Sequence, residues 1–337
     1  IIDGLRKGNA NYRFSGILYR NAGGVITNNT VRNITDNPQG GNQHSNGIIV
    51  RNEDGAARSI EISNNTLHDI QKNGISVSGT NLNATIDGNT VIGLGATGSI
   101  AGNGIQVSSG AGGVVSNNFI TGYDYIPAPP PAIQWVSTGM LIYDAADGIQ
   151  ILNNVVNASD VNIYIYLVDN AVVQGNKTTG GEYGIGIWQS NNANLNGNEI
   201  SWAELTGVEV WNSTGVLVNY NKIHDNTEGI TNWDSGNIVD ATNNWWGCAG
   251  GPGTTGCDSA YDGNLDLRNS KGTQGFNIIY EPFATADLDP DGDNIYDPLD
   301  NCPLTANPDQ ADSNKNGVGN ACEPADDGGT TPPAPGG

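Results

Sequence analysis

The stretch Ile60-Glu61-Ile62-Ser63-Asn64-Asn65-Thr66-Leu67 recurs in variant form along the chain and decides the fold. Its pattern is apolar-x-apolar-x-x-Asn-x-apolar, and the copies place the asparagine at Asn29, Asn65, Asn89, Asn118, Asn154, Asn176, Asn198, Asn221 and Asn244. Successive asparagines are 36, 24, 29, 36, 22, 22, 23 and 23 residues apart. The basic repeat therefore has 22 or 23 residues, and the longer spacings indicate inserted loops.

A second phrase, Gly-apolar-x-apolar, lies between these copies, as in Gly74-Ile75-Ser76-Val77. Each period thus contains two short strands joined by bends rich in Gly and Asn. Alternation directs Ile60 and Ile62 inward and Glu61 outward. Strands this short share a core only when coils stack, so the sequence predicts an all-β, right-handed parallel β-helix solenoid of about nine coils. We expect each repeat asparagine to occupy a left-handed bend and to stack into a ladder.

The repeats resemble the right-handed parallel β-helix superfamily, which includes pectate lyases and many surface proteins, over residues 1–283. The most specific segment is Asp240-Ala241-Thr242-Asn243-Asn244-Trp245-Trp246-Gly247 with Gly251-Pro252-Gly253 and Ile278-Ile279-Tyr280-Glu281-Pro282-Phe283. It resembles the closing coil of secreted repeat proteins. Residues 240–283 are therefore expected to cap the core, with Trp245 and Trp246 plugging its open end.

Composition restricts the location and the partners. The net charge of −22 disfavours nucleic acid and anionic membranes and favours cations. No run reaches the roughly 18 apolar residues that a membrane span needs. The four cysteines form local pairs, Cys248 with Cys257 and Cys302 with Cys322. Such pairs favour two disulfides in an oxidising compartment, although free thiols are the alternative. We expect an extracellular or cell-surface protein that is processed or trimmed, because the chain opens like the middle of a strand.

Residues 284–323 carry a metal-ligand register. Acidic residues occupy positions 1, 3, 5, 9 and 12 of a twelve-residue loop, with a backbone carbonyl at position 7: Asp289, Asp291, Asp293, Asp297, Asp300 and Ile295. A second loop repeats the register with Asp312, Asn314, Asn316, Val318, Asn320 and Glu323. Hard oxygen ligands in this number predict Ca²⁺ rather than Mg²⁺, and the second loop, with fewer carboxylates, is expected to bind more weakly.

The same stretch resembles a thrombospondin type 3 repeat, through Asp300-Asn301-Cys302-Pro303, Asn307-Pro308-Asp309-Gln310 and Cys322. This resemblance implies that Asn307 and Asp309 contribute ligands as well. A module so poor in apolar residues depends on metal and disulfide for order. Residues 324–337 have the Pro- and Gly-rich composition of a linker or tail.

Aromatic residues stand four positions after the Gly or Asn of the later coils, at Tyr143, Tyr166, Trp188, Trp211 and Trp233. On a regular stack these residues would form one file of rings. A file of flat rings suits sugars or a docking protein. The alternative is that the rings cover one another or lie beneath the Pro-rich insertion.

No residue is assigned a catalytic role. The pairs His68-Asp69 and His224-Asp225 belong to coils expected to lie far apart, and Asp144 and Asp147 have no basic residue near them in sequence. The leading hypothesis is a calcium-stabilised extracellular scaffold or adhesive protein, which self-associates head to tail into a filament or surface layer or binds cell-surface or matrix glycans. The alternatives are a lyase or hydrolase of acidic polysaccharides, and a non-catalytic glycan-binding adhesin.

Overall fold

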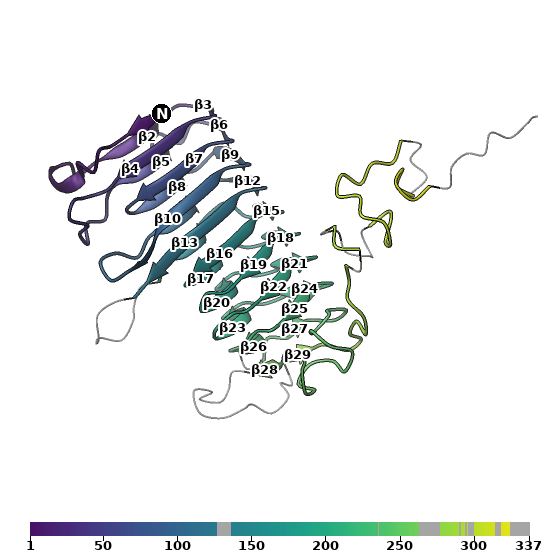
Figure 1. Ribbon diagram of the computed structural model, residues 1–337. Helices are drawn as coiled ribbons and strands as arrows, with labels where there is room; N and C mark the ends of the chain where they lie inside the picture. Colours follow the sequence, from purple (N-terminus) through teal and green to yellow (C-terminus); the bar gives the residue numbers. More distant parts are fainter. Residues whose placement is uncertain are drawn as a thin grey trace, which may run out of the picture. The chain divides into compact units, whose positions relative to one another are not determined.

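The computed structural model describes residues 1–126, 136–234, 236–262, 277–289, 291–293, 295, 300–313 and 318–323. The chain folds as two units, Ile1–Asp287 and Leu288–Gly337. The first unit contains three parallel sheets whose strands stack coil upon coil (Figure 1). The prediction of an all-β parallel β-helix is confirmed. Among the described residues, no helix is long and apolar enough to cross a membrane.

We call the three sheets A, B and C, and in each coil the chain passes through them in the order B, C, A. Sheet A contains β1 (Ile2–Asp3), β4 (Thr30–Ile34), β7 (Thr66–Ile70), β10 (Thr90–Thr97), β13 (Phe119–Tyr125), β16 (Val155–Ser159), β19 (Lys177–Thr179), β22 (Glu199–Ser201) and β25 (Lys222–His224). Sheet B contains β2 (Ser15–Arg20), β5 (Asn46–Arg51), β8 (Asn73–Ser78), β11 (Asn103–Ser108), β14 (Thr138–Tyr143), β17 (Val161–Tyr166), β20 (Tyr183–Trp188), β23 (Thr206–Trp211), β26 (Glu228–Asn232) and β28 (Ala260–Asp262).

Sheet C contains β3 (Gly24–Thr27), β6 (Arg58–Ser63), β9 (Leu82–Asp87), β12 (Gly112–Ser116), β15 (Gln150–Leu152), β18 (Val172–Gln174), β21 (Asn194–Asn196), β24 (Leu217–Asn219), β27 (Val239–Asp240) and β29 (Ile278–Ile279). A 3-10 turn, η1 (Gly8–Ala10), precedes β2. The expectation of two strands per period was wrong, because each complete coil has three. The repeat phrase spans two of them: β6 ends at Ser63 and β7 begins at Thr66, so a two-residue corner hides the break.

The core consists of rows of like side chains in register. One row runs from Ile48 through Ile75, Ile105, Met140, Ile163, Ile185 and Val208 to Ile230. The glycine before most of these positions allows sheet B to approach sheet A. A Cβ atom on Gly74, for example, would lie 2.6 Å from the Gly104 carbonyl oxygen and would clash with Val91.

The repeat asparagines form the predicted ladder at the corner between sheets C and A. Asn176 donates from Nδ2 to Asn198 Oδ1 at 3.0 Å and to the Ile151 carbonyl at 2.8 Å. Its own Oδ1 accepts from both the backbone N–H and Nδ2 of Asn154, each at 2.9 Å. The left-handed backbone conformation belongs to the preceding residue, such as Asn64, Asn117 or Asn153, rather than to the ladder asparagine as we expected. At this corner, one residue adopts the left-handed turn conformation and the next, the ladder asparagine, forms the hydrogen bonds between coils.

Among the described residues, Trp246 lies over the C-terminal end of the β-helix core. Trp246 is completely buried and packs over Gly229, whereas Trp245 is partly exposed and pairs with Lys222 as an isolated bridge. The expectation that both rings plug the core was therefore wrong for Trp245. Cys248 and Cys257 form a disulfide in this cap, and Cys302 and Cys322 form one in the second unit.

Candidate functional site

The aromatic residues of the later coils lie on the outer face of sheet B. Parallel pairing puts Tyr143 beside Tyr166, Tyr166 beside Trp188 and Trp188 beside Trp211. Their side chains point away from the core because the alternating positions Ile163, Ile165, Ile185 and Ile187 fill it. The rings of Tyr143 and Tyr166 are 5.3 Å apart, and those of Trp188 and Trp211 are 5.0 Å apart.

The aromatic rings of this file cover one another only in part. Tyr143 and Trp211 remain 38% and 39% exposed, so neighbouring rings do not shield them fully. Tyr164, which sequence reasoning missed, links the two ring pairs. Its ring stacks with Tyr166 at 5.9 Å and meets Trp188 edge-on at 5.3 Å. The Pro-rich insertion, residues 127–135, lies outside the described residues.

A groove of about 690 Å³ opens beside this file on sheet B. Four aromatic and three acidic residues line it: Tyr164, Tyr183, Trp188, Trp233, Glu182, Glu209 and Glu228. Trp188 and Trp233 are the only members of the predicted file in the described lining. Gly186 contributes to the floor, since it lies between Tyr164 and Glu209 in the strand register and has no side chain. This outward position of β20 has no side chain of its own, and the ring of Tyr164 lies against it.

Glu209 is the most buried acidic residue of the groove, with 5% of its surface exposed. Trp188 Nε1 donates to its Oε2 and Trp233 Nε1 to its Oε1, each at 2.8 Å. Burial raises the pKa of Glu209 above its ordinary value, although the two indole hydrogen bonds oppose the shift. The two tryptophans are therefore held by a shared carboxylate, which fixes their orientation in the groove.

Two further acidic residues extend the negative surface. Glu228 Oε2 accepts a hydrogen bond from Thr231 at 2.8 Å and a longer one from Thr206 at 3.4 Å. Burial, followed by the nearby carboxylates of Glu204 and Asp124, raises the pKa of Glu182. The described lining contains no Lys, Arg or His. The sequence did not predict this group of glutamates because they belong to different coils. Their position on one face of sheet B follows only once the strands of successive coils are paired.

The described ends of the Pro-rich insertion are held next to this groove. Asp160 accepts the backbone N–H groups of Tyr125 at 2.9 Å and Ser137 at 2.7 Å. Burial raises the pKa of this carboxyl, and the adjacent Asp124 adds to the shift. Val136, the first described residue after the insertion, lines the groove.

The His-Asp pairs remain apart, as the sequence predicted. His68 and His224 lie on β7 and β25, which are six strands apart in sheet A. Each ring Nδ1 contacts the adjacent aspartate, at 2.8 Å for Asp69 and 2.7 Å for Asp225. Asp144 and Asp147 lie in the corner between β14 and β15 and do not line the groove. Within the described part of the chain, no catalytic constellation links these residues.

The acidic module, residues 288–323, brings together part of the predicted calcium register. The ligand oxygens of Asp289, Asp291 and Asp293 all lie within 4.8 Å of one another. Asp289 Oδ1 accepts the N–H of Gly292 at 2.9 Å, and Asp293 accepts the N–H groups of Ile295 and Asn307 at 2.8 and 2.7 Å. Buried Oδ2 atoms of Asp291 and Asp300 have no hydrogen-bond partner among the residues that the structure describes. Carboxylate oxygens are the ligands that Ca²⁺ takes, so Asp289, Asp291 and Asp293 could hold one ion together.

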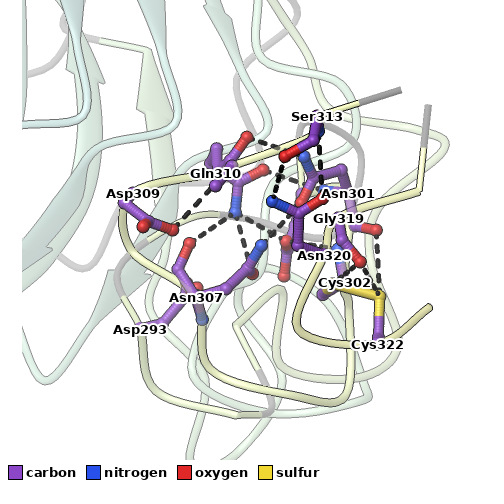
Figure 2. The surroundings of a disulfide bond; sticks show 12 residues. Asp293, Asn301, Cys302, Asn307, Asp309, Gln310, Ser313, Gly319, Asn320 and Cys322 are labelled. Carbon is purple, nitrogen blue, oxygen red and sulfur yellow. Dashed lines mark hydrogen bonds between the residues drawn. A yellow bond between two sulfur atoms is a disulfide. The ribbon is translucent and has the colours of Figure 1, made fainter. Parts of the chain in front are cut away.

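Other predicted ligands have structural partners. Asp300 Oδ1 accepts from Cys302 N and Gln310 Nε2. Figure 2 shows Asn307, whose Nδ2 donates to Asn301 Oδ1. Asp309 bonds the N–H of Ala311, and Asn320 bonds Ser313. Asp312 and Glu323 are not part of the carboxylate cluster, and the predicted carbonyl ligand Val318 has no side-chain ligand atom that could join it. Asp297, Asn314, Asn316 and the tail 324–337 lie outside the described residues.

Comparison with known proteins relates the repeat to periplasmic β-helix proteins. Residues 131–246, about a third of the chain, match the family model described as periplasmic copper-binding protein (NosD). No curated protein sequence matches the chain. A copper site prefers His, Cys and Met donors. The matched stretch has one histidine, His224, and one methionine, Met140, which is completely buried in the core. These residues do not fit a copper centre.

One solved structure shows a similar fold. A mutant of the periplasmic alginate epimerase AlgG superimposes with a TM-score of 0.53 at 12% identity, over 80% of this chain and 62% of the epimerase. The chain therefore spans less than two thirds of that protein. The A-module of the Azotobacter vinelandii mannuronan C-5 epimerase AlgE6 aligns over 79% of this chain and 91% of the module, with 15% identity and a TM-score of 0.27.

Proposed function

We propose that this protein is an extracellular β-helix scaffold that binds glycans in the groove of sheet B. The observation that carries this proposal is the groove itself, where Tyr164, Trp188 and Trp233 border a polar floor. Flat aromatic surfaces next to hydrogen-bonding groups suit sugar rings, which have apolar faces and polar edges. The bond from each indole to Glu209 pre-orients both tryptophans, which lowers the entropy cost of binding.

The proposed location outside the cytoplasm rests on two supports. Both pairs of cysteines are disulfide-bonded, which suits an oxidising compartment. The matched family model and the AlgG structure are also described as periplasmic. Calcium binding by the acidic module, with Asp289, Asp291 and Asp293 as its first ligands, and head-to-tail self-association are further parts of the proposal.

Glycan binding is tested by calorimetry and glycan-array measurements on the full chain. We expect Trp188→Ala to weaken binding at least about tenfold, because a central aromatic anchor typically contributes that much. The matched control is Trp202→Ala, since Trp202 is 61% exposed and does not line the groove. Equal binding by the two variants and the wild type would exclude the groove as the glycan site.

A glycoside hydrolase is the second candidate. Glu209 is a buried carboxyl with a raised pKa, and Glu228 is a second carboxyl in the same groove, so the pair offers an acid and a partner. The lack of Lys, Arg and His in the described lining disfavours a lyase, which needs a base and a group to neutralise the substrate carboxylate. Release of reducing ends from any bound glycan would establish the hydrolase, and loss of this activity in Glu209→Gln would locate it.

A further inference from the structure

Glu209 is a buried carboxylate without a cationic partner among the described residues. Both of its oxygens accept hydrogen bonds, but the donors are the neutral indoles of Trp188 and Trp233. None of the salt bridges formed by the described residues includes Glu209. Buried charges in proteins are normally paired. The floor of the groove therefore has a negative charge that the described part of the chain does not neutralise.

The surrounding lining reinforces this charge. Glu228 and Glu182 also line the groove, and the charge of Glu228 contributes to the raised pKa of Glu209. Because the described lining has no basic residue, an anionic ligand such as a uronate chain would meet only repulsion. A cation entering the groove would gain several charge-assisted contacts. It would also meet the faces of aromatic rings, which attract cations.

Building on the proposed glycan binding, we propose that this groove selects amino sugars, with the ammonium group of a glucosamine-type residue paired to Glu209 and Glu228. Trp188 and Trp233 would contact the faces of the sugar, and Thr206 and Thr227 add hydroxyl groups to the lining. A bare Ca²⁺ ion suits the groove less well, since it requires six to eight oxygen ligands, whereas an ammonium group has only three N–H donors to satisfy. The ligand class thus differs from the alginate named for the structurally similar epimerase.

The test compares three hexasaccharides of matched length by calorimetry with the full chain, at several pH values from mildly acidic to neutral, because the amines have to be protonated and Glu209, whose pKa is raised, has to be ionised. We expect the glucosamine oligomer to bind at least about tenfold more tightly than its N-acetylated form, because a charge-assisted pair contributes about this much, and the mannuronate oligomer not to bind. Raising the salt concentration should weaken only the glucosamine complex.

Variants identify the groups responsible. Glu209→Gln and Glu228→Gln should each reduce the preference for glucosamine by about tenfold, and circular dichroism establishes that each variant is folded. Glu61→Gln is the matched control, because Glu61 is exposed on β6 of sheet C, and it should leave the preference unchanged.

The outcomes separate this inference from the proposed function. Equal affinity for the glucosamine and N-acetylglucosamine oligomers would overturn amino-sugar selection and leave glycan binding intact, as would tighter binding of mannuronate. Oligolysine that binds as tightly as the glucosamine oligomer would also overturn it, since the groove would then recognise cations of any kind. Absence of binding to every glycan on an array would overturn both proposals.

Discussion

At the scale of single residues, the ladder asparagines satisfy their polar atoms within the β-helix. Asn176 is 1% exposed, yet its amide donates to a carbonyl of the preceding coil and to the next asparagine, and its oxygen accepts twice. A buried polar group stabilises a fold only when it is bonded in this way. The corner thereby tolerates a polar row directly beside the apolar core.

Replacement of Asn176 by alanine should therefore be costly. The change would leave the backbone N–H of Asn154 without its acceptor and Asn154 Nδ2 with the Val115 carbonyl alone. We therefore expect the free energy of unfolding to fall by about 3 kcal/mol. Denaturant unfolding followed by circular dichroism measures the loss. Asn194→Ala is the control, because Asn194 lies on the outer face of β21 and should change stability by less than about 0.5 kcal/mol. A loss equal to that of the control would show that the ladder contributes nothing.

At the scale of elements, sheet A carries a row of alternating charges across its last three coils. Glu199 lies between Lys177 and Lys222 in the strand register, and its carboxylate contacts Lys177 at 2.8 Å and His224 at 3.5 Å. His224 and Lys177 lower the pKa of Glu199 to about 2, and Glu199 and Asp225 in turn raise the pKa of His224. The row thus couples neighbouring coils electrostatically.

This row predicts a pH window for stability. Glu199 has a lowered pKa, so its contribution is complete above the ordinary value of 4.5 and is lost as the pH falls towards 2. His224 has a raised pKa, so its contribution is complete below 6.5 and is lost as the pH rises through the folded value. The penalty of Glu199→Gln should thus be largest between pH 4.5 and 6.5, on the order of 2 kcal/mol.

Thermal unfolding across this pH range provides the measurement. Glu53→Gln is the matched control, because Glu53 pairs with Arg20 in an exposed ion pair of small expected value. A penalty for Glu199→Gln that did not diminish at about pH 3 would contradict the electrostatic account.

The elements also show which parts of the fold and site could be predicted from the sequence. The spacing of Asn176, Asn198 and Asn221, at 22 and 23 residues, predicted the coil and the ladder, because identical residues at a nearly constant period indicate stacked coils. The third sheet was missed because the corner between β6 and β7 has only two residues and no glycine. The groove was missed because its lining comes from several coils: Gly186 lies between Tyr164 and Glu209 only when neighbouring strands are placed in register.

At the scale of the whole molecule, two units of different chemistry share one chain. The β-helix has a continuous apolar core from Ile26 to Ile278, whereas the acidic module has a single disulfide and few buried apolar residues among those described. Burial of so few apolar residues is a weak source of order, and for this reason we propose that the carboxylates of the second unit bind an ion.

We therefore expect calcium to stabilise the acidic module and leave the β-helix unchanged. Calorimetric titration should detect Ca²⁺ uptake that Asp291→Asn and Asp293→Asn weaken at least about tenfold, since each removes a carboxylate ligand. A concentration of about one hundred times Kd should stabilise the module by about 2.7 kcal/mol, measured as protection of residues 288–323 from proteolysis. Asp147→Asn, at an exposed corner of the β-helix, is the control.

The same preparations test self-association. Light scattering and electron microscopy with calcium and with chelator should show assemblies that lengthen when calcium is present. Identical monomers under both conditions would exclude a calcium-linked filament, and undetectable Ca²⁺ uptake would exclude the metal site.

The unbroken asparagine corner has a consequence for how such a protein can grow. The asparagines of successive coils stay in contact although insertions lengthen a coil from 22 to 36 residues. The corner between sheets C and A therefore keeps the coils in register, while the other two corners accept insertions. Duplication of the segment from one asparagine to the next would add one coil, whose asparagine could form the ladder hydrogen bonds with the coils on both sides. Repeat number is then free to vary by recombination, and binding faces can be diversified at the remaining corners without rebuilding the interior.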